Sequence, residues 1–318
     1  MARRKEITMT ETVVLDQVTK SYGAFNAISD ASFQLNAGEN IALVGHNGAG
    51  KTTMIKLMLG LIRPTKGSIR VLGEDPAAGA FAARLKLGYL PEHVSFNMAL
   101  TGAETLKFYA RLKNVSKSQI AGLLDRVGLA DASHRRVGTY SKGMRQRLGL
   151  AQALLGQPSV LLLDEPTTGL DPALRQSFYD ILEHLRQEGT TILMSSHALT
   201  ELESKVGRVI IANKGKIIAD GSIEALRRIS QLPLRIRVQS EDALKLPETS
   251  QQIDLQWQQL DTGAFETEAP GDGKMELIRH IIANNDNLTE LDVVPPTLDE
   301  LYAHFLNVGD ALTKEAAE

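Results

Sequence analysis

Hydrophobic and polar positions alternate along the first 230 residues with two different spacings. Short apolar runs rich in β-branched residues predict strands, and longer stretches with helical periodicity lie between them. Several of the runs are almost purely apolar, which is typical of strands covered by helices on both faces. The alternation predicts an α/β domain with a largely parallel sheet. The strand candidates are residues 11–18, 40–44, 68–72, 159–164, 190–195 and 208–212.

Residues 100–155 break this rhythm. They contain three stretches with helical patterns and no clear strand between them. We therefore expect a helical subdomain, over about residues 95–155, inserted into the α/β core.

The pattern changes again after Ile229. Short alternating runs at 232–240, 253–260 and 263–269 predict strands, and a helix, a strand and a final helix are expected before the chain ends. We predict two domains, a large one over residues 1–230 and a small α+β accessory domain over 231–318. The small domain carries no recognisable chemistry, and our hypothesis is that it mediates dimer contacts or regulation.

The composition limits the classes of protein to which this chain can belong. A chain of 318 residues supports one large domain and one small one. The net charge of -3 and the pI near 6.2 give no general attraction to nucleic acid, so we expect no nucleic-acid partner. The sequence contains no cysteine, which excludes disulfides and thiolate metal sites. The basic start is not followed by an apolar run, and no stretch approaches the roughly 18 apolar residues of a membrane span, so we expect neither a secretory signal nor a spanning helix.

A glycine-rich loop follows the apolar strand 40–44 and opens a helical stretch. Residues 45–52 read GHNGAGKT and match the spacing of a phosphate-binding loop. Glycines let the backbone curl until successive N–H groups point at phosphate oxygens, and the helix N-terminus adds a favourable dipole. A chance match to this spacing, a glycine-rich turn without a ligand, is on the order of one in a hundred for such a chain. The expected phosphate ligands are Asn47, Gly48, Ala49, Gly50, Lys51, Thr52 and Thr53, and Thr52 is also expected to ligate Mg²⁺.

An Asp-Glu pair closes the apolar run 159–164. Ligands bind at the carboxyl ends of strands in open α/β sheets, so both carboxylates are expected at the nucleotide site. Asp164 suits the outer ligand sphere of Mg²⁺, and Glu165 suits a general base that aligns the attacking water. Helix N-capping is the alternative for such a pair, and the phosphate loop upstream favours the catalytic interpretation.

With these motifs in place, the chain resembles the ABC ATPase family over about residues 11–230. The stretch YSKGMRQRLGLAQAL, residues 140–154, is similar to the signature sequence of that family. The resemblance implies a P-loop NTPase fold and an anion site formed by Ser141 and the Gly143 amide at a helix N-terminus. This site faces the γ-phosphate held by a second subunit, so the resemblance implies a homodimer that encloses two ATP molecules.

Three further positions take their roles from the same resemblance. Asp171, in TTGLDP, matches the residue that reaches across the dimer interface. His197 matches the histidine that contacts the γ-phosphate and the attacking water, whereas an isolated histidine at a strand end would be taken as a capping residue. Tyr22 matches the aromatic residue that stacks on adenine, and a partly buried tyrosine at a strand end is the alternative.

Two departures from the family pattern affect the site. Glu92 stands where the family usually has glutamine, at the position that senses Mg²⁺ and the permease. A carboxylate offers oxygen to Mg²⁺ but adds a negative charge, worth about 4 kcal/mol at ~4 Å and an effective dielectric constant of ~20 before screening. Lys142 and Met144 stand in the signature where glycine and glutamine are commoner. Similar variants occur in ABC ATPases that work with ABC-2-type permeases.

Residues 45–76 also resemble the NosF group of ABC ATPases, which serve the copper-processing system that matures nitrous oxide reductase. This resemblance implies integral-membrane permease chains and a periplasmic accessory protein as partners. It implies a peripheral location on the cytoplasmic face of the inner membrane. Since the chain has no cysteine and no clustered histidine, this subunit would supply energy and would not carry copper.

Three other functional interpretations stay open at this point. A generic ABC-2-type exporter ATPase would share every motif but move another substrate. An ABC protein of translation or DNA repair usually carries two ATPase domains, zinc-binding segments or basic insertions, none of which is evident here. A regulatory module that binds nucleotide without hydrolysis would not need Glu165 and His197.

Overall fold

The computed structural model describes residues 11–79, 81–240, 244–247, 249–250 and 253–315. The chain divides into two compact units, and the boundary in the sequence lies between Asp220 and Gly221. Within the described residues, no helix combines the length and apolar character that a membrane-spanning segment needs. The two units are described separately below.

The first unit is built on a six-stranded sheet with the order β5-β6-β7-β3-β8-β9. Strands β5, β6, β7, β3 and β8 pair in parallel, and β3, β6 and β7 are buried along their whole length. Full burial explains why their sequences are continuous apolar runs rather than alternating ones. The strands are β3 Asn40–Val44, β5 Leu87–Leu90, β6 Val160–Asp164, β7 Thr191–Ser196, β8 Arg208–Asn213 and β9 Lys216–Gly221.

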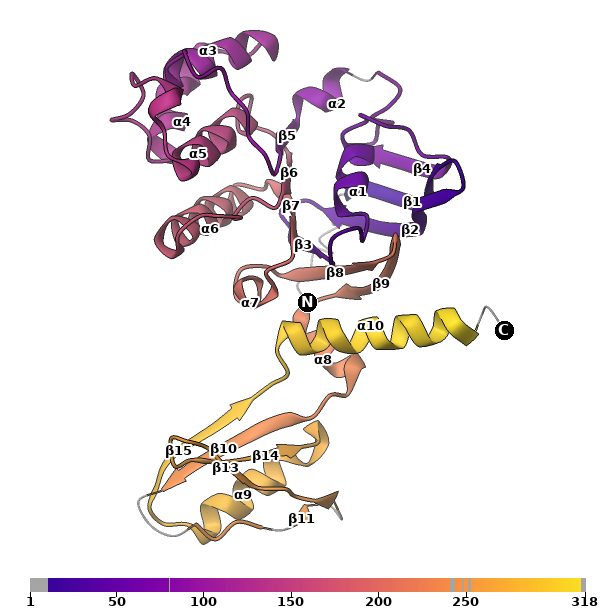
Figure 1. The fold of residues 1–318 in the computed structure, drawn as a ribbon, viewed down its shortest axis with the longest axis vertical. Coiled ribbons are helices and arrows are strands. Elements are labelled where there is room, and N and C mark those ends of the chain that lie inside the picture. Colours follow the sequence, from indigo (N-terminus) through magenta and orange to yellow (C-terminus); the bar gives the residue numbers. More distant parts are fainter. Residues whose placement is uncertain (1–10, 80, 241–243, 248, 251–252, 316–318) are drawn as a thin grey trace, which may run out of the picture. The chain divides into compact units, whose positions relative to one another are not determined.

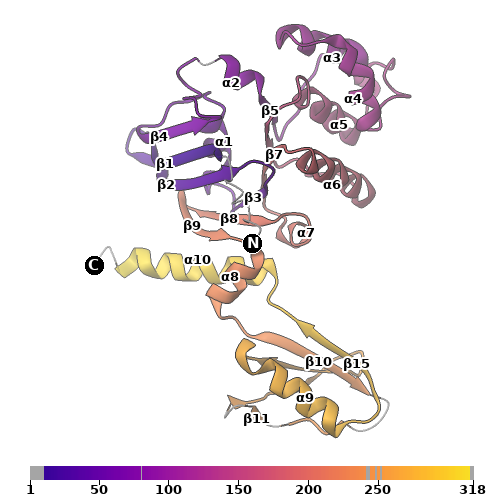
Figure 2. The ribbon, with the colours of Figure 1, turned by 180° about the vertical axis from the view of Figure 1, so that it is seen from behind.

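A second, antiparallel sheet has the order β2-β1-β4, and helix α1 (Lys51–Met58) lies between the two sheets (Figures 1 and 2). One apolar core joins the inner face of this sheet, α1 and the near face of the parallel sheet. Met54, Ile55 and Met58 of α1 are fully buried in it. The strands are β1 Glu11–Tyr22, β2 Phe25–Asn36 and β4 Lys66–Val71.

Three of the other helices of this unit, α3, α4 and α5, lie together in Figure 1. Helices α3, α4 and α5 make up the insertion between β5 and β6, and α5 contacts β5 and the other two helices. Thr101 begins α3 with a reciprocal capping box to Glu104, which satisfies free N–H groups at that end. The helices are α2 Phe81–Leu85, α3 Gly102–Leu112, α4 Ile120–Arg126, α5 Lys142–Ala153, α6 Pro172–Gln187 and α7 Leu199–Leu202.

The second unit contains a four-stranded antiparallel sheet with the order β13-β14-β10-β15. Alternate residues of β10 are buried, and Ile236 and Val238 pack with Leu277 and Ile281 of α9. Helices α8 and α10 contact each other at the two ends of this segment. The elements are α8 Ile223–Ser230, β10 Leu234–Ser240, β11 Thr249–Ser250, β12 Ile253–Asp254, β13 Gln258–Gln259, β14 Phe265–Ala269, α9 Lys274–Asn284, β15 Leu288–Val294 and α10 Leu298–Glu315.

The α/β fold with an inserted helical subdomain is confirmed. The structure adds β2, β5 and β9, which the apolar pattern did not single out, because each is short or has many polar positions. Strands β1 and β4 belong to the antiparallel sheet and not to the parallel one. The first unit ends at Asp220, ten residues before the predicted boundary at 230. Helix α8 belongs to the second unit, where it contacts α10.

Alanine substitution at two helical glycines of the insertion should change the free energy of unfolding in opposite directions. A Cβ at Gly149, in α5, would lie 2.7 Å from Leu90 Cδ1 and 3.0 Å from Val94 Cγ2, whereas nothing lies within 4 Å of a Cβ at Gly122, in α4. We expect Gly149→Ala to lower the free energy of unfolding by about 1–3 kcal/mol through overpacking. Gly122→Ala should raise it by up to about 1 kcal/mol through helix propensity. Urea denaturation measures both, and equal shifts would contradict the packing of α5 on β5.

Candidate functional site

The loop between β3 and α1 depends on glycine at three positions. Gly48 and Gly50 have φ angles of 86° and 101°, in the left-handed region that disfavours side chains. A Cβ at Gly45 would lie 2.5 Å from the carbonyl oxygen of Ala212, and one at Gly50 would lie 2.6 Å from Ile28 Cδ1. Gly50 is the N-cap of α1 and caps no N–H with a side chain. The first N–H groups of α1 are therefore available to an anion.

This loop forms one wall of a cavity of about 330 Å³. The opposite wall comes from the carboxyl ends of β6 and β7 and from the segment after β5. Residues far apart in the sequence thus meet around one space. The lining residues are Phe25, Ala27, His46, Asn47, Gly48, Ala49, Gly50, Lys51, Thr52, Thr53, Glu92, Asp164, Glu165 and His197.

Lys51 is buried, with 7% of its surface exposed, and bridges the two walls. Its Nζ donates to the carbonyl oxygen of Gly45 at 2.6 Å and lies 3.5 Å from Oε1 of Glu165. A buried ammonium needs such partners, because its desolvation is costly. The side chain is held at the cavity by a carbonyl and a carboxylate that a phosphate group can replace.

Ser195 holds the two carboxylates of β6 in place. Its hydroxyl donates to Asp164 Oδ1 at 2.6 Å and accepts the N–H of Glu165 at 2.9 Å. Glu165 has a φ angle of 48°, so its backbone turns out of the strand and brings the side chain back toward the loop. The sequence analysis did not identify Ser195. Its role follows from the strand register, which sets it opposite Asp164 on β6 and which the sequence alone does not give.

His197 joins the same network from the end of β7. Its Nδ1 lies 2.8 Å from Oε2 of Glu165, and its side chain is 58% exposed. With a proton on Nδ1, the ring donates to the carboxylate and leaves Nε2 directed elsewhere. Glu165 thus has one oxygen near Lys51 and the other bonded to His197.

Three of the lining residues have oxygen atoms that suit Mg²⁺. Thr52, Glu92 and Asp164 offer one hydroxyl and two carboxylates, which are the hard ligands this ion prefers. Burial, Asp164 and Glu92 all raise the pKa of Tyr89, which keeps its hydroxyl neutral beside the carboxylates. No group of three or more acidic or histidine side chains in the described residues could hold a metal alone. An ion at this point would need further ligands from phosphate and water, as Mg²⁺ bound with a nucleotide has.

The predicted adenine-stacking residue lies just outside this lining. Tyr22 ends β1, pairs across the turn with Phe25, and has Lys20 Nζ 5.0 Å from its ring centre. Phe25 lines the cavity and is 67% exposed, and Tyr22 is 51% exposed. Gly23, with a φ angle of 60°, forms the turn that brings the two rings to one end of the hairpin. The sequence analysis overlooked Phe25, which follows Tyr22 by three residues.

The signature residues do not line the cavity of their own chain. Ser141 begins α5 and accepts the N–H of Met144 at 3.2 Å, and Asp171 begins α6 and accepts the N–H of Leu174 at 2.9 Å. A Cβ at Gly143 would lie 2.7 Å from Leu174 Cδ1, so the two helix starts pack closely there. Within one chain, these polar side chains act as N-caps.

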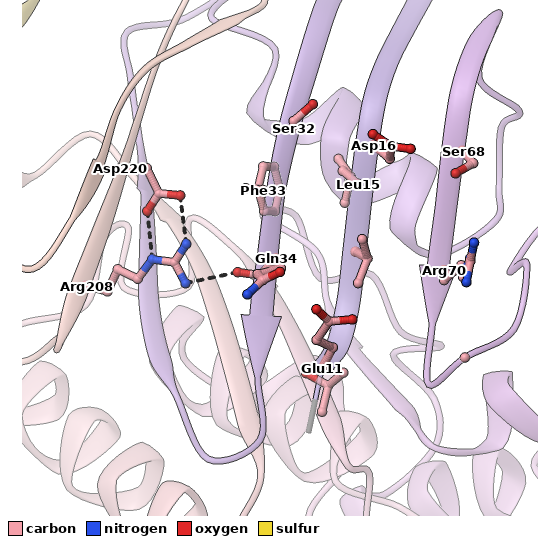
Figure 3. A pocket seen from close by; sticks show the side chains of 13 residues that line it. Glu11, Leu15, Asp16, Ser32, Phe33, Gln34, Ser68, Arg70, Arg208 and Asp220 are labelled. Carbon is pink, nitrogen blue, oxygen red and sulfur yellow. Dashed lines mark hydrogen bonds and ion pairs between the residues drawn. The ribbon is translucent and has the colours of Figure 1, made fainter. Parts of the chain in front are cut away.

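A larger cavity of about 660 Å³ lies on the outer face of the antiparallel sheet (Figure 3). Its Arg208 donates two bonds of 2.7 Å to Asp220 and a third, of 2.9 Å, to the carbonyl oxygen of Gln34. The bonds to Asp220 raise the pKa of Arg208. This guanidinium is already satisfied by the protein, and the lining contains a single glycine, Gly73, rather than a glycine-rich loop at the start of a helix. The smaller cavity is therefore the better candidate for a ligand.

Known proteins of one family resemble this chain. The family model "ABC transporter" matches residues 28–168. The chain is 34% identical over 313 residues to the daunorubicin resistance ATP-binding protein DrrA3 of Streptomyces coeruleorubidus, which covers 96% of this chain and 98% of the relative. It is 37% identical over 218 residues to the Nod factor export ATP-binding protein I of Paraburkholderia xenovorans, covering 67% and 72%. A solved structure titled "Structure of ATP binding subunit of ABC transporter" has a TM-score of 0.64 and 30% identity, covering 69% of this chain and 92% of the other.

The bonds of Lys51 predict a large effect of its removal on nucleotide binding. We expect Lys51→Ala to weaken binding of a fluorescent ATP analogue on the order of 10–100-fold, because charge-assisted bonds to phosphate are lost. Lys56, exposed on the same helix, provides the matched control, and Lys56→Ala should bind as the unmodified protein does. Equal affinities for the two variants would contradict a phosphate role for Lys51.

Proposed function

This chain belongs to the ATP-binding subunits of ABC transporters, and we propose that it is the ATP-hydrolysing partner of a separate membrane permease in an export system. The single observation that carries the proposal is the contact of Glu165 with both Lys51 and His197 beside the phosphate loop. Relatives named for daunorubicin resistance and Nod factor export support the exporter assignment.

The contacts of Glu165 support a role as general base. Lys51 lies 3.5 Å from one carboxylate oxygen of Glu165, and His197 bonds to the other. A γ-phosphate competes with Glu165 for the Lys51 ammonium, since a phosphate carries more charge than one carboxylate. The oxygen released in this way can accept the proton of the attacking water. His197, bonded to the same carboxylate, is placed to sense whether the γ-phosphate is present.

Magnesium fits the same site. Thr52 and Glu92 would hold the ion, with Asp164 beside them, and Mg²⁺ would neutralise charge on the transferring phosphoryl group. Ser195 keeps Asp164 in place through its 2.6 Å bond. Adenine would stack on the exposed rings of Tyr22 and Phe25 at the mouth of the cavity.

We propose a homodimer as the hydrolytic form. Ser141, Gly143 and Asp171 lie outside the cavity of their own chain, although each matches a family position that acts on nucleotide. The N-terminus of α5 suits an anion. In the dimer, it would bind the phosphate that the loop of a second copy holds. ATP would then favour the closed dimer, because it contacts both chains only in that state.

An exposed apolar surface beside Glu92 supports coupling to a permease. A cavity of about 540 Å³ includes Pro91 and His93, the two neighbours of Glu92, together with Leu112 of α3. Phe108 and Leu112 are 51% and 64% exposed on that helix, which is unusual for large apolar side chains unless a partner covers them. A permease segment seated there would contact the chain next to Glu92. The proposed location is therefore peripheral, on the cytoplasmic face of the inner membrane.

Copper processing is the second candidate, supported by the resemblance of residues 45–76 to the NosF group. It would add a periplasmic accessory protein to the complex. The relatives described above are named for other cargoes and do not support the copper role. The cargo is decided by the permease, so co-purification of the permease separates the two candidates. The role of residues 231–318 in dimer contacts or regulation likewise stays a proposal.

Replacement of the proposed base separates nucleotide binding from hydrolysis. We expect Glu165→Gln to keep ATP binding and to lower kcat by about 10²-fold or more, because the amide cannot accept the proton from water. The release of inorganic phosphate by the purified protein measures this. Glu74→Gln, at an exposed turn, is the control and should retain full turnover. Near-normal turnover of Glu165→Gln would remove Glu165 from the mechanism.

The apolar surface on α3 predicts that its removal weakens binding to the permease and leaves hydrolysis intact. We expect the double variant Phe108→Ala, Leu112→Ala to keep its basal ATPase rate within about twofold and to lose on the order of tenfold in affinity for its permease, since buried aromatic anchors dominate interfaces. Leu61, 65% exposed elsewhere on the unit, gives the control variant Leu61→Ala. Co-purification from membranes measures the association. Unchanged recovery of the double variant would contradict the proposal that this surface contacts the permease.

A further inference from the structure

One half-buried ammonium joins three elements of the first unit. Lys113 is the C-cap of α3, and its Nζ donates to the carbonyl oxygen of Leu155 at 2.7 Å and to that of Leu87 at 3.0 Å. Leu87 is the first residue of β5, and Leu155 follows the C-cap of α5. A single side chain therefore ties two helices of the insertion to a strand of the core.

The opposite ends of these elements carry residues of the proposed site. Strand β5 leads through Pro91 to Glu92, and α5 begins with Ser141 as its N-cap. Helix α5 spans 12 residues, or about 18 Å, so a small rotation at one end displaces the other. Gly149 packs against Leu90 midway along this contact. Lys113 closes the contact at the end remote from the nucleotide.

The surroundings of Lys113 are unfavourable for a charge. Among the described residues no carboxylate pairs with it, and its partners are carbonyl oxygens. Burial, followed by the charge of Lys86, lowers the pKa of Lys113 to about 8. The titratable groups that face it across the adjoining cavity are Tyr89, His93 and Tyr109. A charged lysine in these surroundings lowers the stability of the fold. Its two hydrogen bonds, to the carbonyl oxygens of Leu87 and Leu155, are the contribution that offsets this cost.

We propose that Lys113 is a positioning residue of the ATPase, whose ammonium holds the helical insertion against β5 so that the signature helix and Glu92 keep the spacing that hydrolysis requires. The inference rests on the hydrolytic function proposed above. Lys113 does not line the nucleotide cavity and acts through β5 and α5.

The proposal has a distinctive dependence on pH. Below about pH 8 the protonated side chain binds both carbonyls and the negative end of α5. Above that pH the neutral amine loses the charge, so the tether weakens and the ATPase rate should fall. Stability should move the other way. The folded pKa of this base is depressed, so charging it in the fold costs free energy, and this cost disappears as the pH rises from about 8 toward the unfolded value.

The test compares Lys113→Arg and Lys113→Met with the unmodified full-length chain, using ATPase rates from pH 6.5 to 9.5. The unmodified chain should show an alkaline limb near pH 8, which Lys113→Arg shifts upward because its guanidinium stays charged. Lys113→Met should lower kcat on the order of tenfold at pH 7 and lose the limb, while trinitrophenyl-ATP binding stays within about twofold, since a misplaced element costs rate more than affinity. Lys107→Met, on the exposed face of α3, is the control and should keep the rate and the limb of the unmodified chain.

The outcomes separate this inference from the function beneath it. An unmodified chain without ATPase activity overturns the proposed function. An active chain whose limb is the same in Lys113→Arg overturns the inference about Lys113 alone, as does a Lys113→Met protein with normal kcat. If Lys113→Met does not fold, the comparison of Lys113→Arg with the unmodified chain still decides.

Discussion

The parallel register of β3, β7 and β6 is the constraint on which the site depends. Val44, the last residue of β3, lies opposite Ser196, and Ser195 lies opposite Asp164. The phosphate loop, His197 and Glu165 each follow directly after these positions. A shift of any strand by one residue would turn its side chains to the other face and separate the loop from both carboxylates. Because all three strands are fully buried, such a shift is costly, and the apolar core protects the geometry of the polar edge.

Each charge buried at that edge has a polar partner. Asp164, Lys51 and Glu165 are 2%, 7% and 9% exposed. Asp164 accepts from Ser195, while Lys51 and Glu165 share an ion pair that His197 extends. Breaking one partner of such a network leaves an unpaired buried charge, which is expensive. In the proposed mechanism, the phosphates of a nucleotide would take the place of the Gly45 carbonyl and the Glu165 carboxylate as partners of Lys51.

Sequence patterns predicted those parts of the site that are local in the chain. The loop from Gly45 to Thr52 and the pair Asp164–Glu165 each have a recognisable spacing beside an apolar strand, and the structure brings them to one cavity. Ser195 and Phe25 were missed because their importance comes from neighbours across a sheet or a turn, which no linear spacing records. Strand β2 was missed for a related reason. Its alternation of polar and apolar residues is that of an antiparallel strand with one exposed face, not of the continuous apolar runs around it.

The helical insertion must also keep its position against the parallel sheet, which it contacts through α5 and β5. Helix α5 contacts β5 through Gly149, where the absent side chain allows close approach, and Lys113 secures the far end of the same pair. Apolar contact alone is non-directional, so polar contacts help to fix the position of α5 along β5. Hydrogen bonds to two particular carbonyls add direction to that contact. In the proposed dimer, Gly149 and Lys113 would together set the spacing between the signature helix and the phosphate loop of a second copy, although both residues lie outside the nucleotide cavity.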